Sequence, residues 1–193
     1  MPDQSQPHRA AAPGVAASDP RFVDAYRSLS EDIAAGLAVL SCLRSGRGQA
    51  ITIDSYLDVS WDPPTMAVSI YGGSRMMESL EFTDSCALSI LNQEQKGVAQ
   101  WLGEPGQPLY GVLDTVSTIT SPAGLPVIAG CLAFFDLRIV DRVEVATHVL
   151  VVGEVTACGS ETFDSPDSRT DSGRRMPLVR WAEQYGTFTS RGA

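Results

Sequence analysis

The chain has 193 residues, of which 44% are hydrophobic and 19% charged, and a formal net charge of -9. This length and composition are typical of one globular domain. The negative charge and the lack of a Lys/Arg block argue against a nucleic-acid partner, because phosphate binding depends on clustered cations. No apolar run reaches the roughly 18 residues that span a bilayer. The N-terminus lacks a signal-peptide pattern, so we expect a cytoplasmic protein without a membrane segment.

The four cysteines stand apart in the sequence and form no C-x-x-C pair. Because only two histidines could add ligands, the spacing does not match a zinc site, and we predict no metal centre. Cys42, Cys86 and Cys131 lie in apolar runs and are expected to be small buried hydrophobic residues. Unpaired thiols fit a reducing cytoplasm.

Residues 1–19 are rich in Pro, Ala, Gln and Ser and predict a disordered N-terminal tail. Asp19 and Pro20 then form a helix start signal, a cap residue before a proline suited to the first helical position. Apolar residues recur at helical spacing after it, at Phe22, Tyr26, Leu29 and Ile33. The pattern predicts an amphipathic helix that ends near Gly36 and packs its apolar stripe on the core.

A β-hairpin is expected next, with strands at 37–43 and 49–54 and a turn at 44–48. The stretch Ala50–Pro64 starts on the second of these strands, passes through short polar side chains and stops at two prolines. Since proline cannot continue a ladder, this stretch predicts a strand that ends in a polar loop. Taken alone, such a loop is more often a surface turn than a ligand site.

The rest of the chain is strand-rich with few helices. Strands are expected at 65–71, 86–91, 131–140 and 149–155, and a short helix at 76–80. Asn92 and Gln95 form a capping box before a second helix, whose packing face carries Val98, Trp101 and Leu102. The pattern predicts a mainly β fold, a closed antiparallel β-barrel with peripheral helices.

Two segments lack apolar periodicity. Residues 103–122 predict an irregular excursion near a pocket, and residues 159–173, dominated by Ser and Asp, predict a solvated or partly disordered loop. Residues 177–188 return to apolar and aromatic types.

Several motifs occur in an order that resembles a known family. Residues 50–64 read A-x-T-x-x-S-aromatic-x-x-V-S-x-D-P-P and lead through a strand to the G-G-S-R run at 72–75. Apolar motifs follow at 124–133, 147–155, 177–179 and 185–186. Together they resemble the flavin reductase-like family of FMN-binding split barrels over about residues 22–188. The resemblance implies a Greek-key-like split barrel, a single domain over residues 20–190 and a homodimer with the flavin near the subunit interface.

The resemblance also implies site residues. Residues that match Thr52, Ser55, Val59 and Ser60 line the flavin in this family, and Asp58 lies among them. Ser74 and Arg75 match the residues that hold the flavin phosphate, although the same run is also read as a glycine turn before a helix. Tyr185 is a candidate to cover a ligand.

His148 matches a residue beside the flavin, on the side where the nicotinamide approaches. We expect it to orient the pyridine nucleotide or donate a bond to the flavin; a structural role is the alternative. Two positions depart from the family pattern, because Asp58 stands where a small hydroxyl residue is usual and Met76 where a short residue is usual. A carboxylate near an anionic ligand is unfavourable unless it is paired or points away.

The leading hypothesis is an NAD(P)H-dependent flavin reductase that passes hydride from NADH or NADPH to FMN or FAD and supplies a partner monooxygenase. Such chemistry needs no side-chain nucleophile, which agrees with the lack of a Ser/His/Asp or Cys/His arrangement. One alternative is a split-barrel flavoenzyme that oxidises or oxygenates an organic substrate with tightly bound flavin. Another is a non-catalytic flavin-binding accessory protein.

Overall fold

The computed structural model describes residues 19–108, 111–160, 175–182 and 184–187. Within these residues, one antiparallel sheet contains seven strands in the order β3-β2-β6-β9-β10-β5-β4. Their bounds are β2 (Ala38–Arg44), β3 (Arg47–Ile53), β4 (Tyr56–Trp61), β5 (Pro64–Tyr71), β6 (Ser85–Ile90), β9 (Ala133–Val145) and β10 (His148–Gly159).

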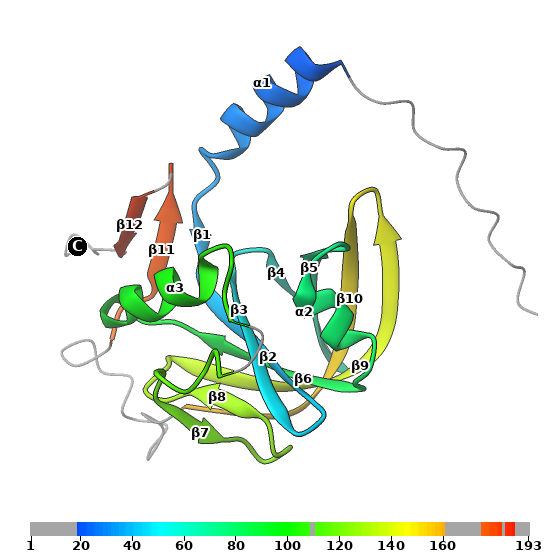
Figure 1. Cartoon of the computed structure of the whole chain (residues 1–193), viewed down its shortest axis with the longest axis vertical. Helices are drawn as coiled ribbons and strands as arrows, with labels where there is room; N and C mark the ends of the chain where they lie inside the picture. Colours follow the sequence, from blue (N-terminus) through cyan, green and yellow to red (C-terminus); the bar gives the residue numbers. More distant parts are fainter. Residues whose placement is uncertain (1–18, 109–110, 161–174, 183, 188–193) are drawn as a thin grey trace, which may run out of the picture.

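The chain connectivity forces this sheet to close. Strands β3 and β4 form its two edges, yet only Asp54 and Ser55 join them. The edges of a flat seven-stranded sheet would lie about 29 Å apart, whereas the link spans about 10 Å at most. The sheet therefore curls into a barrel (Figure 1), and Ser69 N–H donates to the Ser55 carbonyl at 2.9 Å near the closure. The predicted mainly β barrel is confirmed.

Strand β2 is buried on both faces and separates two hydrophobic clusters. Leu40 and Cys42 face the barrel interior, whereas Val39 and Leu37, which directly precedes the strand, belong to a second cluster on the outside. This explains why β2 reads as a continuous apolar run and not as an alternating one. Cys42 and Cys86 lie in the inner cluster and Cys131 in the outer one, so their predicted burial is confirmed.

The outer cluster is covered by helix α3 (Lys96–Gly103) and by a two-stranded sheet, β7 (Thr118–Thr120) with β8 (Pro126–Ile128). The capping box is confirmed: Asn92 Oδ1 accepts from Glu94 N–H and Gln95 Oε1 accepts from Asn92 N–H, where the 3-10 turn η1 (Gln93–Gln95) begins. Trp101 packs less than expected, because it remains 36% exposed and donates its indole N–H to the Val112 carbonyl.

A small sheet of three strands lies beside the barrel, with β1 (Ala35–Gly36), β11 (Leu178–Trp181) and β12 (Gln184–Thr187). An ion pair between Arg180 and Asp54, at 2.5 Å, joins this sheet to the link between β3 and β4. Helix α2 (Arg75–Leu80) follows β5 as predicted and buries Met76, Met77 and Leu80.

The prediction for the first helix is partly wrong. Helix α1 (Pro20–Ser30) begins at the predicted cap, where Asp19 accepts from Arg21 N–H, but it ends at Ser30 and not near Gly36. Its stripe does not pack on the core, since Phe22, Tyr26, Leu29 and Ile33 are 65% to 71% exposed. In Figure 1 the helix stands clear of the barrel. Helical periodicity creates an apolar stripe but does not say which surface covers it.

The polar loop expected within residues 50–64 is also mostly a strand. Residues 56–61 form β4, which pairs with β5, and the chain reverses at Asp62 and Pro63. Short polar residues fit there because β4 is the last strand in the sheet order and pairs with a neighbouring strand, β5, on one side only. The turn between β2 and β3 is as predicted, with Ser45 and Gly46 at φ 52° and 72° in a two-residue hairpin.

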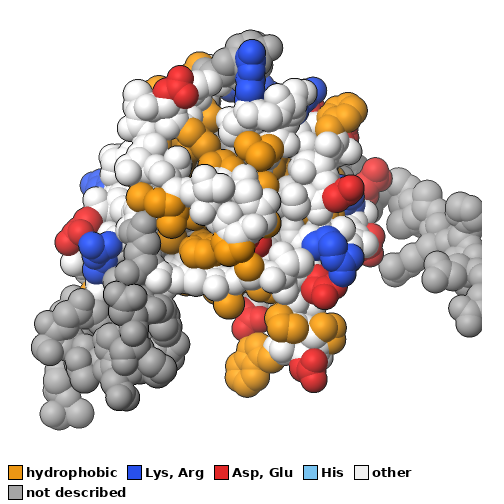
Figure 2. Space-filling model, turned by 90° about the horizontal axis from the view of Figure 1, so that it is seen from below, with side chains coloured by type: hydrophobic (Ala, Val, Ile, Leu, Met, Phe, Trp, Pro, Cys, Tyr) orange, Lys and Arg blue, Asp and Glu red, His pale blue; other side chains and the backbone are white. Residues whose placement is uncertain are grey.

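Figure 2 shows one face of the molecule, with hydrophobic side chains gathered near its middle and cations beside carboxylates at its rim. This face carries no continuous basic surface of the kind that nucleic-acid binding uses. None of the helices in the described ranges is long and apolar enough to cross a membrane. The predicted tail at 1–19 and loop at 159–173 fall almost wholly outside the described residues, and the domain limits of 20–190 stay a prediction.

Candidate functional site

A cavity of about 240 Å³ lies between β3, α2 and the loop that follows α3. Its floor is apolar, because Met76, Leu102 and Val112 are all buried there. Ser74 and Arg75 form its polar rim at the start of α2. The other described lining residues come from β3 and the loop: Gln49, Ala50, Ile51, Gly103, Glu104, Pro105, Gly106, Gln107 and Pro108. An apolar floor with a few polar groups is typical of a small-molecule site.

The rim residues are held by bonds on both sides of the cavity. The Ser74 hydroxyl accepts from Met77 N–H at 3.1 Å and so caps α2, which leaves the hydroxyl proton able to bond an anion. Arg75 Nη2 donates to the Gln107 carbonyl at 2.5 Å and joins α2 to the loop. Together they place a cation and a hydroxyl donor at one end of the cavity.

The turn before α2 lies close to Tyr71 and to the end of the β9–β10 hairpin. A Cβ on Gly73 would lie 2.9 Å from the Tyr71 ring, and a Cβ on Gly72 would lie 3.4 Å from the Thr147 carbonyl. Gly72 N–H donates to that same carbonyl at 3.0 Å. This hydrogen bond holds the turn against the end of the β9–β10 hairpin, which brings His148 near the segment that carries Ser74.

Gln107 lines the cavity and has one side-chain atom without a partner. Its side-chain nitrogen donates to the Trp101 carbonyl, while its Oε1 is buried and has no hydrogen-bond partner among the described residues. A buried acceptor without a partner costs about 1–3 kcal/mol.

The predicted ring-binding residues extend along β3 and β4 and do not line this cavity. Thr52 Oγ1 donates to the Ala99 carbonyl at 2.8 Å and lies beside Gly103 of the cavity wall. Ser55 lies in the link before β4, where its carbonyl accepts from Ser69 N–H and its hydroxyl donates to Asp54. Ser60 lies about 16 Å farther along β4, at a strand rise of about 3.3 Å per residue. Thr52 is thus the nearest of these to the cavity wall.

Asp58 and Val59 lie midway along the same edge strand. Asp58 Oδ2 accepts from the Trp61 indole N–H at 2.8 Å, so its carboxylate is paired on the surface and lies outside the cavity lining. Val59 is half exposed. The carboxylate therefore does not oppose an anion held at Arg75.

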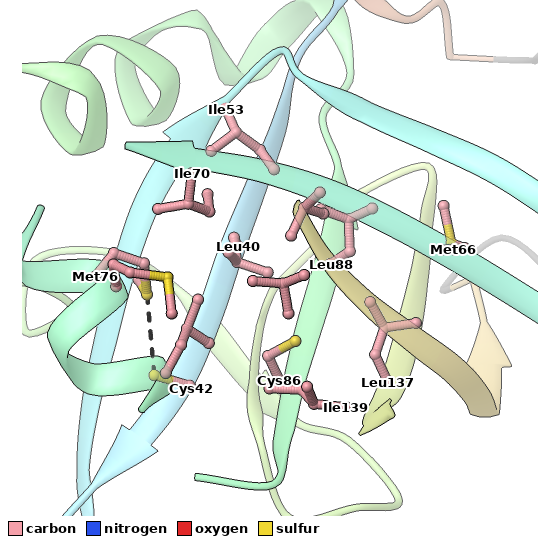
Figure 3. Close-up of a cluster of buried hydrophobic side chains, with 14 of the residues drawn as sticks. Leu40, Cys42, Ile53, Met66, Ile70, Met76, Cys86, Leu88, Leu137 and Ile139 are labelled. Atoms are coloured by element: carbon pink, nitrogen blue, oxygen red, sulfur yellow. Dashed lines mark hydrogen bonds between the residues drawn. The ribbon is translucent and has the colours of Figure 1, made fainter. Parts of the chain in front are cut away.

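The second departure, Met76, is accommodated by the core. Figure 3 shows its side chain directed into the inner hydrophobic cluster, where its sulfur lies 3.9 Å from Cys42 Sγ. Met76 therefore contributes to the cavity floor without filling the cavity.

His148 begins β10 and is exposed. Its Nδ1 lies 3.0 Å from the Thr147 hydroxyl, and its ring meets Tyr71 edge to face at 5.7 Å between centroids. It is paired in register with Tyr71, three residues before Ser74. The structure thus places His148 beside the glycine turn but not in the cavity lining.

Tyr185 lies elsewhere. It lines a separate hollow of about 330 Å³ on the small sheet, together with Trp181 and Gln184, and the Lys96 ammonium lies 5.4 Å from its ring centroid. The described residues of one chain do not bring Tyr185 to the cavity.

The thiols nearest the cavity are not activated. Burial raises the pKa of the Cys42 thiol to about 11, against a weaker lowering by Arg44, and burial raises that of Cys86 to about 12. Both thiols stay protonated at neutral pH and cannot serve as nucleophiles.

Sequence reasoning missed the β3 side of the cavity lining, which Gln49, Ala50 and Ile51 form. The irregular excursion predicted near a pocket at 103–122 does contribute to the lining, through residues 103–108, but Thr118–Thr120 within it form the strand β7. Nothing local in the sequence marks Gln49, because its role depends on how α2 packs across β3.

The family model described as "Flavin reductase like domain" matches residues 29–189. The chain belongs to this family. It is 30% identical over 163 residues to the NADH-dependent flavin reductase StyB of Pseudomonas fluorescens, covering 83% of this chain and 86% of that protein. It is 29% identical over 186 residues to an NADPH-flavin oxidoreductase of Streptomyces viridifaciens, covering 95% of this chain and 90% of that protein.

A solved flavin reductase has the same fold. The styrene monooxygenase flavin reductase SMOB of Pseudomonas putida S12 matches with a TM-score of 0.72 and 26% identity, covering 86% of this chain and 98% of that one. The family resemblance and the split barrel predicted from the sequence are confirmed.

The cavity fits a member of the flavin reductase family. The flavin ring is flat and largely apolar, and its tail carries a phosphate. The apolar floor suits the flavin ring, and the Arg75 guanidinium with the Ser74 hydroxyl suits the phosphate.

Proposed function

We propose that this protein is an NAD(P)H-dependent flavin reductase that uses FMN or FAD and supplies reduced flavin to a partner monooxygenase. The single observation that carries the proposal is the cavity of a flavin reductase family member with Arg75 and Ser74 at its rim and buried apolar side chains at its floor. Relatives named NADH-dependent and NADPH-dependent flavin reductases support the reaction class.

The chain's own residues bind and align. Arg75 and Ser74 would hold the flavin phosphate by charge-assisted hydrogen bonds. The bound pair supplies the chemistry, a hydride passed from the nicotinamide to the flavin. His148 lies on the exposed side of the glycine turn, where it orients the incoming nucleotide. No side-chain nucleophile is required, in keeping with the protonated Cys42 thiol.

A homodimer belongs to the proposal because two apolar surfaces are uncovered in the single chain. One is the α1 stripe, Phe22, Tyr26, Leu29 and Ile33, and the other is the exposed face of β4, Leu57, Val59 and Trp61. Contiguous exposed apolar side chains of this kind usually mark an interface. Packing of a second copy on β4 would also place partner residues beside Ser55 and Ser60, which are predicted to line the flavin.

A monooxygenase partner is supported by the match to the styrene monooxygenase flavin reductase. The cytoplasmic location expected from the sequence remains a prediction.

The proposal is tested by mixing the purified protein with flavin and NADH or NADPH without oxygen. Rapid loss of the visible flavin absorption, faster than in protein-free controls, is the expected result. Slow loss combined with turnover of an organic substrate would favour the flavoenzyme alternative instead. Flavin binding without either would leave an accessory protein.

Arg75→Gln should weaken FMN binding by about 1–3 kcal/mol, because a charge-assisted phosphate bond is lost. Fluorescence titration with oxidised FMN measures the change. Arg138→Gln is the matched control, since Arg138 pairs with Glu154 on the barrel surface and is absent from the cavity lining. Equal affinity of Arg75→Gln and the control would remove Arg75 from the site.

His148→Ala should slow hydride transfer by about 1 kcal/mol, roughly fivefold, while flavin affinity stays within about twofold. Stopped-flow reduction and flavin titration separate the two effects. Unchanged rates would leave His148 with a structural role against Tyr71.

A further inference from the structure

Helix α2 carries both rim residues of the cavity, yet it is too short to hold its own position. It has six residues, and isolated helices shorter than about 12–15 residues are marginal in water. Ser74 caps the helix and Arg75 is its first residue, so the two polar groups at the cavity rim move with it. The contacts that fix the helix therefore also fix the rim.

The C-terminal end of α2 is held by a side chain from another part of the chain. Arg142 Nη2 donates to the carbonyls of Leu80 and Thr83, both at 2.8 Å. Leu80 is the last residue of α2, and the carbonyls of a last helical turn have no partner within the helix. The last turn of α2 has no basic residue of its own, so Arg142, 62 residues farther along the chain, supplies the cation that suits a helix C-terminus.

The register of the barrel directs Arg142 toward the helix. Arg142 lies in β9 opposite Val151 of β10, and residues paired directly in this way point to the same face of a sheet. Val151 belongs to the inner hydrophobic cluster, which also contains Met76, Met77 and Leu80 of α2. Arg142 therefore extends from the barrel wall on the side where the helix packs.

The β9–β10 hairpin holds the α2 segment at both ends. The Thr147 carbonyl, between the two strands, accepts from Gly72 N–H at 3.0 Å before the helix, and Arg142 bonds the carbonyl at its end. The helix between these attachments is about 9 Å long at a rise of about 1.5 Å per residue. A shift at Leu80 in so short a helix also displaces Arg75 at the other end.

We infer that Arg142 is a positioning residue for the flavin phosphate: by holding the end of α2 to the β9–β10 hairpin, it keeps the Arg75 guanidinium and the Ser74 hydroxyl at the cavity rim. The inference rests on the proposed function, in which those two groups bind the phosphate. Arg142 is not among the described residues that line the cavity. Hydrogen bonds to a phosphate depend on distance and angle, so loss of this attachment weakens phosphate binding. The floor formed by Leu102 and Val112 belongs to the outer cluster and stays in place.

The test compares FMN with riboflavin, which has the same ring but no phosphate. Fluorescence titration of the whole protein with each oxidised flavin gives the two affinities. Arg142→Gln should weaken FMN binding about fivefold, while riboflavin affinity stays within about twofold. Arg138→Gln on the same strand should change neither flavin, since Arg138 pairs with Glu154 on the surface. A role confined to the stability of the fold would shift both flavins alike or neither.

A double variant tests the route through Arg75. In the Arg75→Gln background, Arg142→Gln should weaken FMN binding less than about twofold, because the guanidinium that Arg142 positions is gone. Additive losses would mean that Arg142 acts elsewhere and would overturn the inference. Thermal unfolding first shows that each variant folds. If Arg142→Gln does not fold, Arg142→Met, which keeps the apolar part of the side chain, replaces it with the same expectation.

The outcomes separate the inference from the proposed function. If Arg75→Gln weakens FMN selectively but Arg142→Gln does not, the inference falls and the flavin reductase proposal stands. If Arg142→Gln weakens FMN and riboflavin alike, Arg142 supports the whole cavity and the inference is also overturned. If the wild type binds neither flavin, both fall.

Discussion

Helices α1 and α3 begin with similar sequence signals and end in opposite environments. Each has a polar cap residue followed by apolar residues at helical spacing. In α3, Ala99 and Leu102 are fully buried over β3 and the outer cluster. In α1, no residue is buried by the described part of the chain. Periodicity predicts that a helix has an apolar face, but the surface that covers the face depends on the rest of the fold.

The difference comes from how each helix is attached. Asn92 ties the start of the α3 segment to the barrel through its Nδ2, which donates to the Gly130 carbonyl at 2.8 Å, and Thr52 Oγ1 bonds the Ala99 carbonyl within the helix. The segment after α1 is joined to the small sheet where Ala182 N–H donates to the Glu31 carbonyl at 3.1 Å. A helix with one backbone tether at its end can lie against another molecule.

The largest expected effect is on stability, and it should differ between a buried leucine of α3 and an exposed leucine of α1. Leu102→Ala should lower the free energy of unfolding by about 3 kcal/mol, since it opens a cavity among fully buried side chains. Leu29→Ala, the same change on an exposed stripe, should cost less than about 0.5 kcal/mol in the monomer. Urea denaturation at low protein concentration measures both. Equal losses would mean that α1 packs within its own chain.

The contrast between covered and uncovered side chains extends to the thiols. In the folded barrel, burial raises the pKa of Cys42 from 9.0 to about 11 and that of Cys86 from 9.0 to about 12. Above about pH 9 the unfolded chain loses these protons first, so it binds fewer protons than the folded state, and the free energy of unfolding falls as pH rises. Between pH 8 and pH 10 we expect a loss of about 1–3 kcal/mol.

Denaturation at a series of pH values checks this. Cys42→Ala should show a shallower decline despite its lower stability, whereas Cys158→Ser, which removes an exposed thiol, should follow the wild type. A free energy of unfolding that stays level from pH 8 to pH 10 would contradict the buried-thiol explanation.

The smallest expected effect is on dimer formation through the exposed apolar stripe of α1. Tyr26→Ser with Leu29→Ser should raise the dimer dissociation constant at least about tenfold, roughly 1.4 kcal/mol, because two apolar side chains lose their partner surface. Sedimentation velocity over a range of concentrations measures the change, and Asp24→Ser on the same helix is the control. A wild-type chain that stays monomeric throughout would remove the homodimer from the proposal.

Much of the fold and part of the site were predictable from local pattern. The capping box at Asn92, the strand before Gly72 and the phosphate candidates Ser74 and Arg75 are marked by adjacent residues, and the structure places the last two together at the cavity rim. Asp58 is different: its pairing with the Trp61 indole depends on the β4–β5 hairpin, which the sequence had suggested was a loop.

The sequence by itself indicated most of the barrel strands, the helix caps, which cysteines are buried and which family the barrel belongs to, because these depend on residues close together in the chain. Only the tertiary structure decided that α1 is uncovered, that Gln49 and Gln107 face the same cavity and that Arg142 reaches the end of α2. The reason is physical: local spacing sets which face of an element is apolar or charged, whereas closure of the sheet by the two-residue link between β3 and β4 sets which faces meet.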